Sequence, residues 1–94
     1  MTDRELDALR GRIAETDREI LALVNARLEL VRAIRRRKEA LGVPFLDPGQ
    51  EERLLERLRE ANGGPLSADG VERLFREILE LVKAESAEVR APDA

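Results

Sequence analysis

One uninterrupted stretch decides the fold: residues 3–41, DRELDALRGRIAETDREILALVNARLELVRAIRRRKEAL. It contains no proline, and its lone glycine, Gly11, is tolerated inside a helix. Gly42 and Pro44 follow it, and both residues end helices. Within the stretch, apolar side chains recur at steps of three and four residues, which is the spacing of one helix face; they are Leu6, Leu9, Ile13, Ile20, Leu23, Leu30, Ile34 and Leu41. The stretch therefore predicts one helix over about residues 3–41.

Two shorter helices are expected in the second half of the chain, so the predicted fold class is all-α. We expect the second helix over about residues 48–61, with Asp47 as its N-cap and Gln50 as the partner of Asp47 in a capping box. The third is expected over about residues 68–86, with Ser67 as its N-cap. Residues 87–94 are expected to form a frayed tail. A chain of 94 residues predicts a single domain, residues 1–94.

The length of the first helix predicts a dimer. About 39 residues at ~1.5 Å each span roughly 58 Å, whereas a compact domain of this size has a radius of gyration of about 12 Å. The apolar stripe of the helix therefore needs cover from another chain, and closed two-fold dimers are the commonest oligomers. A long coiled-coil pair would bury the stripe equally well. The breaks at residues 42–44 and 62–64 instead favour an intertwined homodimeric helical bundle.

Composition limits the chemistry and the partners of the chain. It contains neither cysteine nor histidine, so disulfides are excluded, and we expect no metal site because the thiolate and the commonest metal ligand are both missing. The first ten residues lack the apolar core of a signal peptide, and no stretch approaches the ~18 apolar residues of a membrane span. We therefore expect a cytoplasmic protein without membrane contact. A net charge of −3 and a shortage of aromatic residues disfavour nucleic acid as a partner. The basic cluster formed by Arg32, Arg35, Arg36, Arg37 and Lys38 has the plainer interpretation of a solvated face near a helix C-terminus.

Two cations lie on the side of the first helix that should be buried. Arg27 is seven residues from both Ile20 and Ile34, and Lys38 is seven residues from Val31. Eleven residues separate the two cations, which places them about 20° apart around the helix. Unpaired charge on a buried face is costly, so this pair favours a small anionic ligand. The alternatives are that Arg27 extends to solvent or pairs with a glutamate, and that Lys38 complements the helix C-terminus.

Polar residues of the two later helices are expected to face the same interior. Glu51 shares a side with the leucines of the second helix, and Asp47 lies one turn before it. On the third helix, Glu85 continues the apolar stripe and Ser86 follows Val82. Asp47 also has the plainer role of a helix cap, and Glu51 that of a solvated carboxylate. An interior lined by cations, without histidine or cysteine, suits a small dianion better than a structural core.

At these residues the chain resembles the all-helical (AroQ-type, type II) chorismate mutases. The segment LDALRGRIAETDREILALVNARLELVRAIRRRK, residues 6–38, is similar to the first helix of that family. Residues 42–58, GVPFLDPGQEERLLERL, are similar to its loop and second helix, and residues 71–82, VERLFREILELV, to the start of its third. The pieces follow one another in the family's order and at matching spacing over roughly residues 6–86.

The resemblance implies an isomerase that rearranges chorismate to prephenate in aromatic amino acid biosynthesis. It implies that Arg27 and, from across the dimer, Arg10 hold the substrate carboxylates, and that Lys38 donates to the ether oxygen of the breaking bond. Asp47 and Glu51 would lie near the ring and its hydroxyl. The reaction needs no nucleophile and no cofactor. Some short family members are also activated by a partner enzyme of the shikimate pathway.

Three positions depart from the family pattern. Gln50 stands where the family usually has Arg, and Val82 stands where Ser is common. Ser86, with Glu85 adjacent, stands where Gln or Glu usually shares the ether oxygen with the lysine. These positions are expected at the substrate, and they leave the catalytic strength open. Three alternatives stay open as well: a 4-amino-4-deoxychorismate mutase, an isochorismate-pyruvate lyase, and a non-catalytic helical dimerisation or regulatory module.

Overall fold

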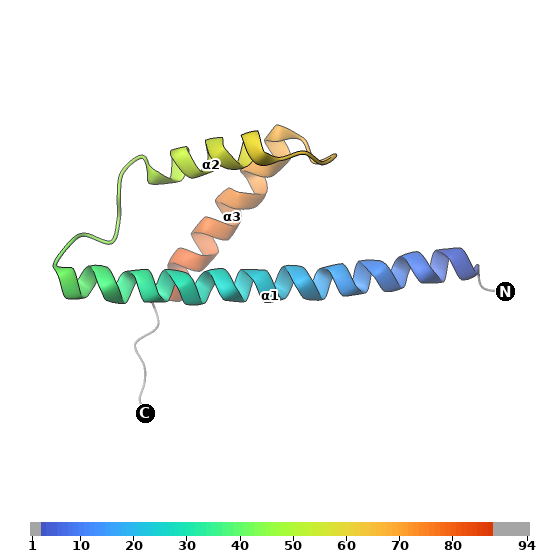
Figure 1. Ribbon diagram of the computed structural model, residues 1–94, viewed down its shortest axis with the longest axis horizontal. Coiled ribbons are helices and arrows are strands. Elements are labelled where there is room, and N and C mark those ends of the chain that lie inside the picture. Colours follow the sequence, from blue (N-terminus) through green and yellow to red (C-terminus); the bar gives the residue numbers. More distant parts are fainter. Residues whose placement is uncertain (1–2, 88–94) are drawn as a thin grey trace, which may run out of the picture.

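The computed structural model describes residues 3–87, which form three α-helices joined by two loops (Figure 1). Helix α1 spans Arg4–Leu41, α2 spans Gln50–Ala61 and α3 spans Ala68–Ala87. The predicted all-α class, with one long and two shorter helices, is confirmed. Within this range, each helix is too short or too polar to cross a membrane. Of the tail expected at residues 87–94, Ala87 ends α3, and residues 88–94 lie outside the described range.

Local capping explains three of the helix ends. The Asp3 side chain accepts hydrogen bonds from the N–H groups of Glu5 and Leu6, at 2.9 and 3.3 Å, and so begins α1. Gly42 ends α1 in the left-handed conformation, at φ 73°, which costs a glycine little. Ser67 Oγ accepts from the N–H of Gly70 at 2.9 Å, as expected of the N-cap of α3.

The prediction that Asp47 caps the second helix is wrong. Helix α2 begins at Gln50, and its N-cap is Gly49, with no side-chain hydrogen bond. Residues 47–50 form a turn closed by a bond from the Gln50 N–H to the Asp47 carbonyl, at 3.0 Å. Gly49, at φ 86° and ψ −14°, has the geometry of the third residue of a type II turn. Proline is common at the second position of such a turn, which Pro48 occupies. The Pro48-Gly49 pair therefore forms a turn before the helix, and the capping box with Gln50 does not form.

The core within a single chain is small. Helix α3 crosses α1 and also packs against α2 (Figure 1). The buried apolar side chains of residues 3–87 are Leu55, Val71 and Val82, and α1 contributes none. The radius of gyration is 17.5 Å, well above the value of about 12 Å expected for a compact chain of this length. The three helices thus form an extended arrangement.

One apolar face of α1 has no cover within residues 3–87. Ile13, Ile20, Leu23 and Leu30 lie along the helix and are between 53 and 69% exposed. The half of α1 nearest its N-terminus runs on beyond the crossing with α3 (Figure 1). The other side of the second half of α1 packs on α3, and Val24, Leu28 and Val31 are partly buried there. The stripe predicted from the sequence is therefore real, but α3 covers only its edge.

Candidate functional site

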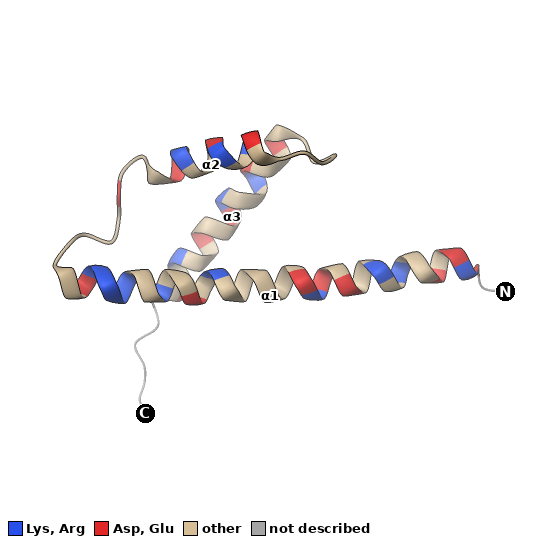
Figure 2. Ribbon diagram, viewed as in Figure 1, with Lys and Arg blue, Asp and Glu red and all other residues tan. Residues whose placement is uncertain are grey.

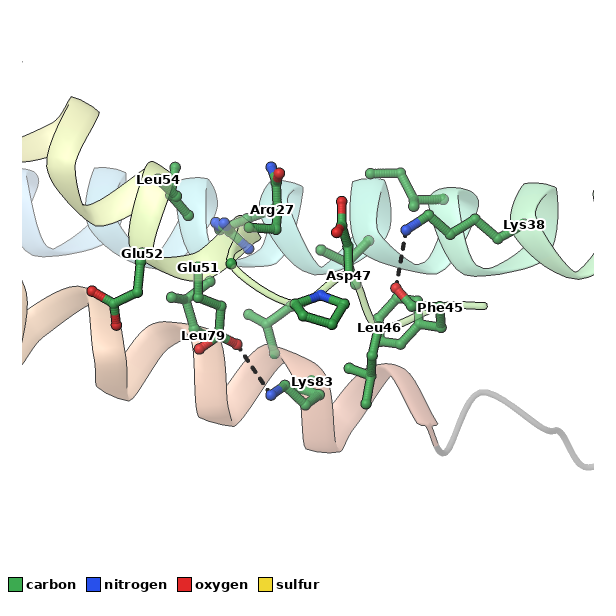
Figure 3. Close-up of a pocket in the computed structure, with 16 residues that line it drawn as sticks. Arg27, Lys38, Phe45, Leu46, Asp47, Glu51, Glu52, Leu54, Leu79 and Lys83 are labelled. Atoms are coloured by element: carbon green, nitrogen blue, oxygen red, sulfur yellow. Dashed lines mark hydrogen bonds and ion pairs between the residues drawn. The ribbon is translucent and has the colours of Figure 1, made fainter. Parts of the chain in front are cut away.

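A cavity of about 800 Å³ lies where the second half of α1, the loop before α2 and the end of α3 come together. It is lined by six of the predicted site residues: Arg27, Lys38, Asp47, Gln50, Glu51 and Val82. Figure 3 shows Arg27 and Lys38 on α1, facing the loop and the start of α2. The cations of α1 are thus brought together with Asp47 and Glu51, as expected from the helix faces, whereas the residues of α3 at the cavity are not the two polar ones expected there.

The two cations of α1 reach the cavity from half-buried positions. Lys38 Nζ donates a hydrogen bond to the carbonyl oxygen of Phe45 at 3.0 Å (Figure 3). Figure 2 shows that Lys and Arg gather toward the C-terminal end of α1, next to this loop. No carboxylate of residues 3–87 forms an ion pair with Arg27 or Lys38. Both cations are therefore free to bind an anion in the cavity.

The carboxylates that line the cavity already have cationic partners. Glu51 Oε2 lies 3.1 Å from Lys83 Nζ (Figure 3). The other two pairs join Asp47 Oδ2 to Arg53 at 3.6 Å and Glu52 Oε2 to Arg76 at 2.9 Å. Because these negative charges are compensated, the uncompensated charge at the cavity is that of the α1 cations.

Arg76, on α3, pairs with Glu52 of this wall and with Glu72 of its own helix. Hydrogen bonds to Glu52 and then to Glu72 raise the pKa of its guanidinium above the usual value, so the side chain stays charged. Arg59 also lies 3.1 Å from Glu72. The Arg76–Glu52 and Arg59–Glu72 pairs join α2 to α3 and support the wall that carries Glu51, although pairs this accessible to water contribute little to stability.

Gln50 has a different role from the capping role expected of it. Its Oε1 accepts from Arg53 Nη2 at 3.0 Å, and the same guanidinium group approaches Asp47. Arg53 thus contacts both Gln50 and Asp47 at the N-terminal end of α2. Sequence reasoning did not single out Arg53, although its position three residues after Gln50 places the two on one helix side.

Two further residues at the cavity were missed from the sequence. Lys83 lines it from α3, four residues after Leu79 on the same helix side, and that spacing was the available signal. Phe45 lines it from the loop, with its ring 3.8 Å below the guanidinium carbon of Arg35. Arg35 is partly buried there, so the basic cluster at the end of α1 is not simply a solvated face.

Three predicted site residues lie outside the cavity of a single chain. Arg10 is exposed on α1, seventeen residues before Arg27, or about 25 Å along the axis. Glu85 is exposed on α3. Ser86 is fully buried; its hydroxyl donates to the Lys83 carbonyl at 3.0 Å and accepts from Arg35 Nε at 3.4 Å. Their predicted contacts with a ligand stay predictions.

Comparison with known proteins gives consistent matches. Residues 9–87 match the family model of chorismate mutase type II. Two bifunctional chorismate mutase/prephenate dehydratases are similar: that of Stutzerimonas stutzeri is 36% identical over 80 residues, covering 80% of this chain and 22% of that protein. The protein from Pseudomonas aeruginosa is 35% identical over 85 residues, covering 84% of this chain and 23% of that protein. The chain thus spans less than a quarter of the length of these curated relatives.

Solved structures are similar over most of their length. The chorismate mutase of Thermus thermophilus in form II has a TM-score of 0.82 and 35% identity, covering 88% of this chain and 94% of that one. Form I has a TM-score of 0.79 and 37% identity, covering 83% of this chain and 98% of that one.

Proposed function

The chain belongs to the type II chorismate mutase family, and we propose that its cavity binds chorismate and rearranges it to prephenate. The observation that carries this proposal is the pair of cations, Arg27 and Lys38, at the cavity without carboxylate partners in residues 3–87. Chorismate is a dianion, so its two negative charges would balance the two positive charges of Arg27 and Lys38. The proposed place of the reaction is the biosynthesis of aromatic amino acids.

The rearrangement is an intramolecular Claisen reaction, in which a C–O bond breaks while a C–C bond forms within one molecule. The protein has to hold the enolpyruvyl arm over the ring, which is catalysis by orientation. Arg27 suits one carboxylate because its fork binds carboxylate through two parallel hydrogen bonds. As the C–O bond breaks, the ether oxygen gains negative charge, and the Lys38 ammonium stabilises that charge.

The second carboxylate is assigned to Arg10 of a partner subunit. Within one chain Arg10 cannot approach Arg27, so this contact requires the proposed homodimer. The exposed apolar face of α1 and the radius of gyration of 17.5 Å support a dimer, because that face needs a second chain to cover it. In an antiparallel pair, the first half of one α1 passes along the cavity of the other subunit.

The remaining wall is proposed to select the substrate. We assign Asp47 and Glu51 to the ring and its hydroxyl, because both line the cavity, as do Gln50 and Val82. Glu85 and Ser86 lie outside the cavity of one chain, so we assign them no contact with the substrate there. A single domain over residues 1–94, a cytoplasmic location and activation by a shikimate-pathway enzyme stay predictions.

The test is a direct assay of purified protein with three substrates. Chorismate absorbance should fall as prephenate forms, whereas isochorismate and the 4-amino analogue should persist. Faster turnover of either analogue would assign the cavity to a different enzyme on this scaffold. If all three compounds persist, and if Arg27→Leu and Lys38→Leu proteins are as stable as the unmodified one or more so, the chain is a non-catalytic module.

A further inference from the structure

Arg35 lies at the centre of a set of contacts that the proposed reaction does not yet use. Its guanidinium carbon lies 3.8 Å from the centre of the Phe45 ring, which is the geometry of a cation–π contact. Its Nε donates to Ser86 Oγ at 3.4 Å. Ser86 is fully buried on α3, and its own hydroxyl is held by the Lys83 carbonyl. Arg35 therefore ties the loop residue Phe45 to the end of α3.

The same loop residue holds the proposed catalytic lysine. The Phe45 carbonyl accepts a hydrogen bond from Lys38 Nζ at 3.0 Å, and that nitrogen lies 5.8 Å from the Phe45 ring centre (Figure 3). A lysine ammonium is a point charge on a flexible four-carbon stem, so its direction depends on what holds it. It carries three donors, and one of them is used here, which leaves two for a ligand.

We propose that Arg35 is a positioning residue that clamps the Phe45 ring so that the Phe45 carbonyl directs the Lys38 ammonium into the cavity. The inference rests on the proposed mutase function. Ser86 is part of the same set of contacts, because its hydroxyl accepts a hydrogen bond from Arg35 and so orients that side chain over the ring. The serine that departs from the family pattern thus acts from behind the lysine, through Arg35 and Phe45, and does not touch the substrate.

The kinetic test separates positioning from simple packing. Arg35→Met keeps an unbranched stem that ends near the position of Nε and so removes the charged guanidinium over the ring, whereas Arg35→Lys restores a cation there. We expect Arg35→Met to lower kcat about tenfold with KM changed less than about twofold, because a misdirected donor affects the transition state more than substrate binding. Arg35→Lys should recover most of the lost kcat. Arg36→Met, at the exposed neighbouring position, is the matched control.

A double variant tests the route through Phe45. If Arg35 acts on Lys38 only through the ring, Phe45→Leu lowers kcat by a similar factor, and Arg35→Met combined with Phe45→Leu is no worse than either change alone. Independent packing effects would instead multiply. Circular dichroism of each variant shows that folded protein is compared, and Arg35→Gln, which also removes the charge, serves if Arg35→Met fails to fold.

A second measurement does not depend on activity. The chain has two aromatic residues, both Phe, so the ring-current shift of the Lys38 side-chain protons reports the position of the Phe45 ring. In NMR spectra these protons should move in Arg35→Met and stay in place in Arg36→Met.

The outcomes distinguish the two proposals. An unmodified protein that converts no chorismate refutes the mutase function, and the positioning role is then decided by NMR. An active protein whose Arg35→Met variant keeps its kcat overturns the positioning role alone. Lys38 protons that shift equally in both variants, or not at all, also overturn it.

Discussion

Replacing Lys38 by Met tests the charge at the centre of the proposed mechanism. Methionine keeps the apolar stem that packs in the wall but removes the donor aimed at the ether oxygen. Losing one preorganised donor of this kind costs about 10²–10³ in rate, or about 2.7–4 kcal/mol of transition-state stabilisation. In the folded protein, the change removes one hydrogen bond, that to the Phe45 carbonyl at 3.0 Å, which contributes only about 0.5–1.5 kcal/mol.

These two magnitudes can be separated in one set of experiments. A domain stable by about 5 kcal/mol that loses about 1 kcal/mol still has more than about 99% of its molecules folded. The fall in kcat/KM, followed as loss of chorismate absorbance, would therefore come from the missing charge and not from unfolding. Arg36→Met, which removes an exposed cation from the same part of α1, should leave kcat/KM unchanged. A Lys38→Met protein within about threefold of the unmodified kcat/KM would refute the assigned role.

Five further substitutions test the dimer, the cavity wall and the core. Arg10→Ala and Arg27→Ala should each be nearly inactive alone, yet mixing them should restore about a quarter of the sites, because half of the dimers are mixed and each mixed dimer has one intact site; no recovery would place Arg10 outside the partner's site. Leu30 is 65% exposed in one chain, so Leu30→Glu should give inactive monomers by light scattering, and a stable dimer would contradict that interface. Lys83→Ala leaves Glu51 without its partner at 3.1 Å, so we expect a several-fold rise in KM for the dianion; an unchanged KM would remove Lys83 from the wall. Leu55→Ala should lower the free energy of unfolding by about 2–5 kcal/mol in urea titrations, since Leu55 is fully buried, whereas a loss below about 1 kcal/mol would contradict that burial.

The helices themselves could be predicted because the signals that define them are local. The start of α1 at Asp3, its end at Gly42 and the cap of α3 at Ser67 each depend on residues within one turn. The start of α2 was misjudged for an equally local reason. Asp47 was given the role of a cap, but the Pro48-Gly49 pair favours a turn, and the helix begins only after it.

The residues of the candidate site were predictable where they belonged to one helix face. Arg27 and Lys38 share a side of α1, and both line the cavity, together with Glu51 from α2. The end of α3 differs from that pattern. Ser86 is buried behind Arg35 in one chain, so its predicted contact with a ligand stays a prediction, and Lys83 lines the wall from α3.

The sequence by itself determined the class of fold, the position of each helix and the two cations that mark the candidate site. These features follow from spacing along one chain, and a helix repeats that spacing every 3.6 residues. Only the tertiary structure decided which carboxylates are compensated, and that Phe45 links Arg35 to Lys38. The physical reason is that these contacts depend on how α3 crosses α1 and on the path of the loop at residues 42–49. Side-chain packing between distant segments sets both, and no pattern within a single helix encodes them.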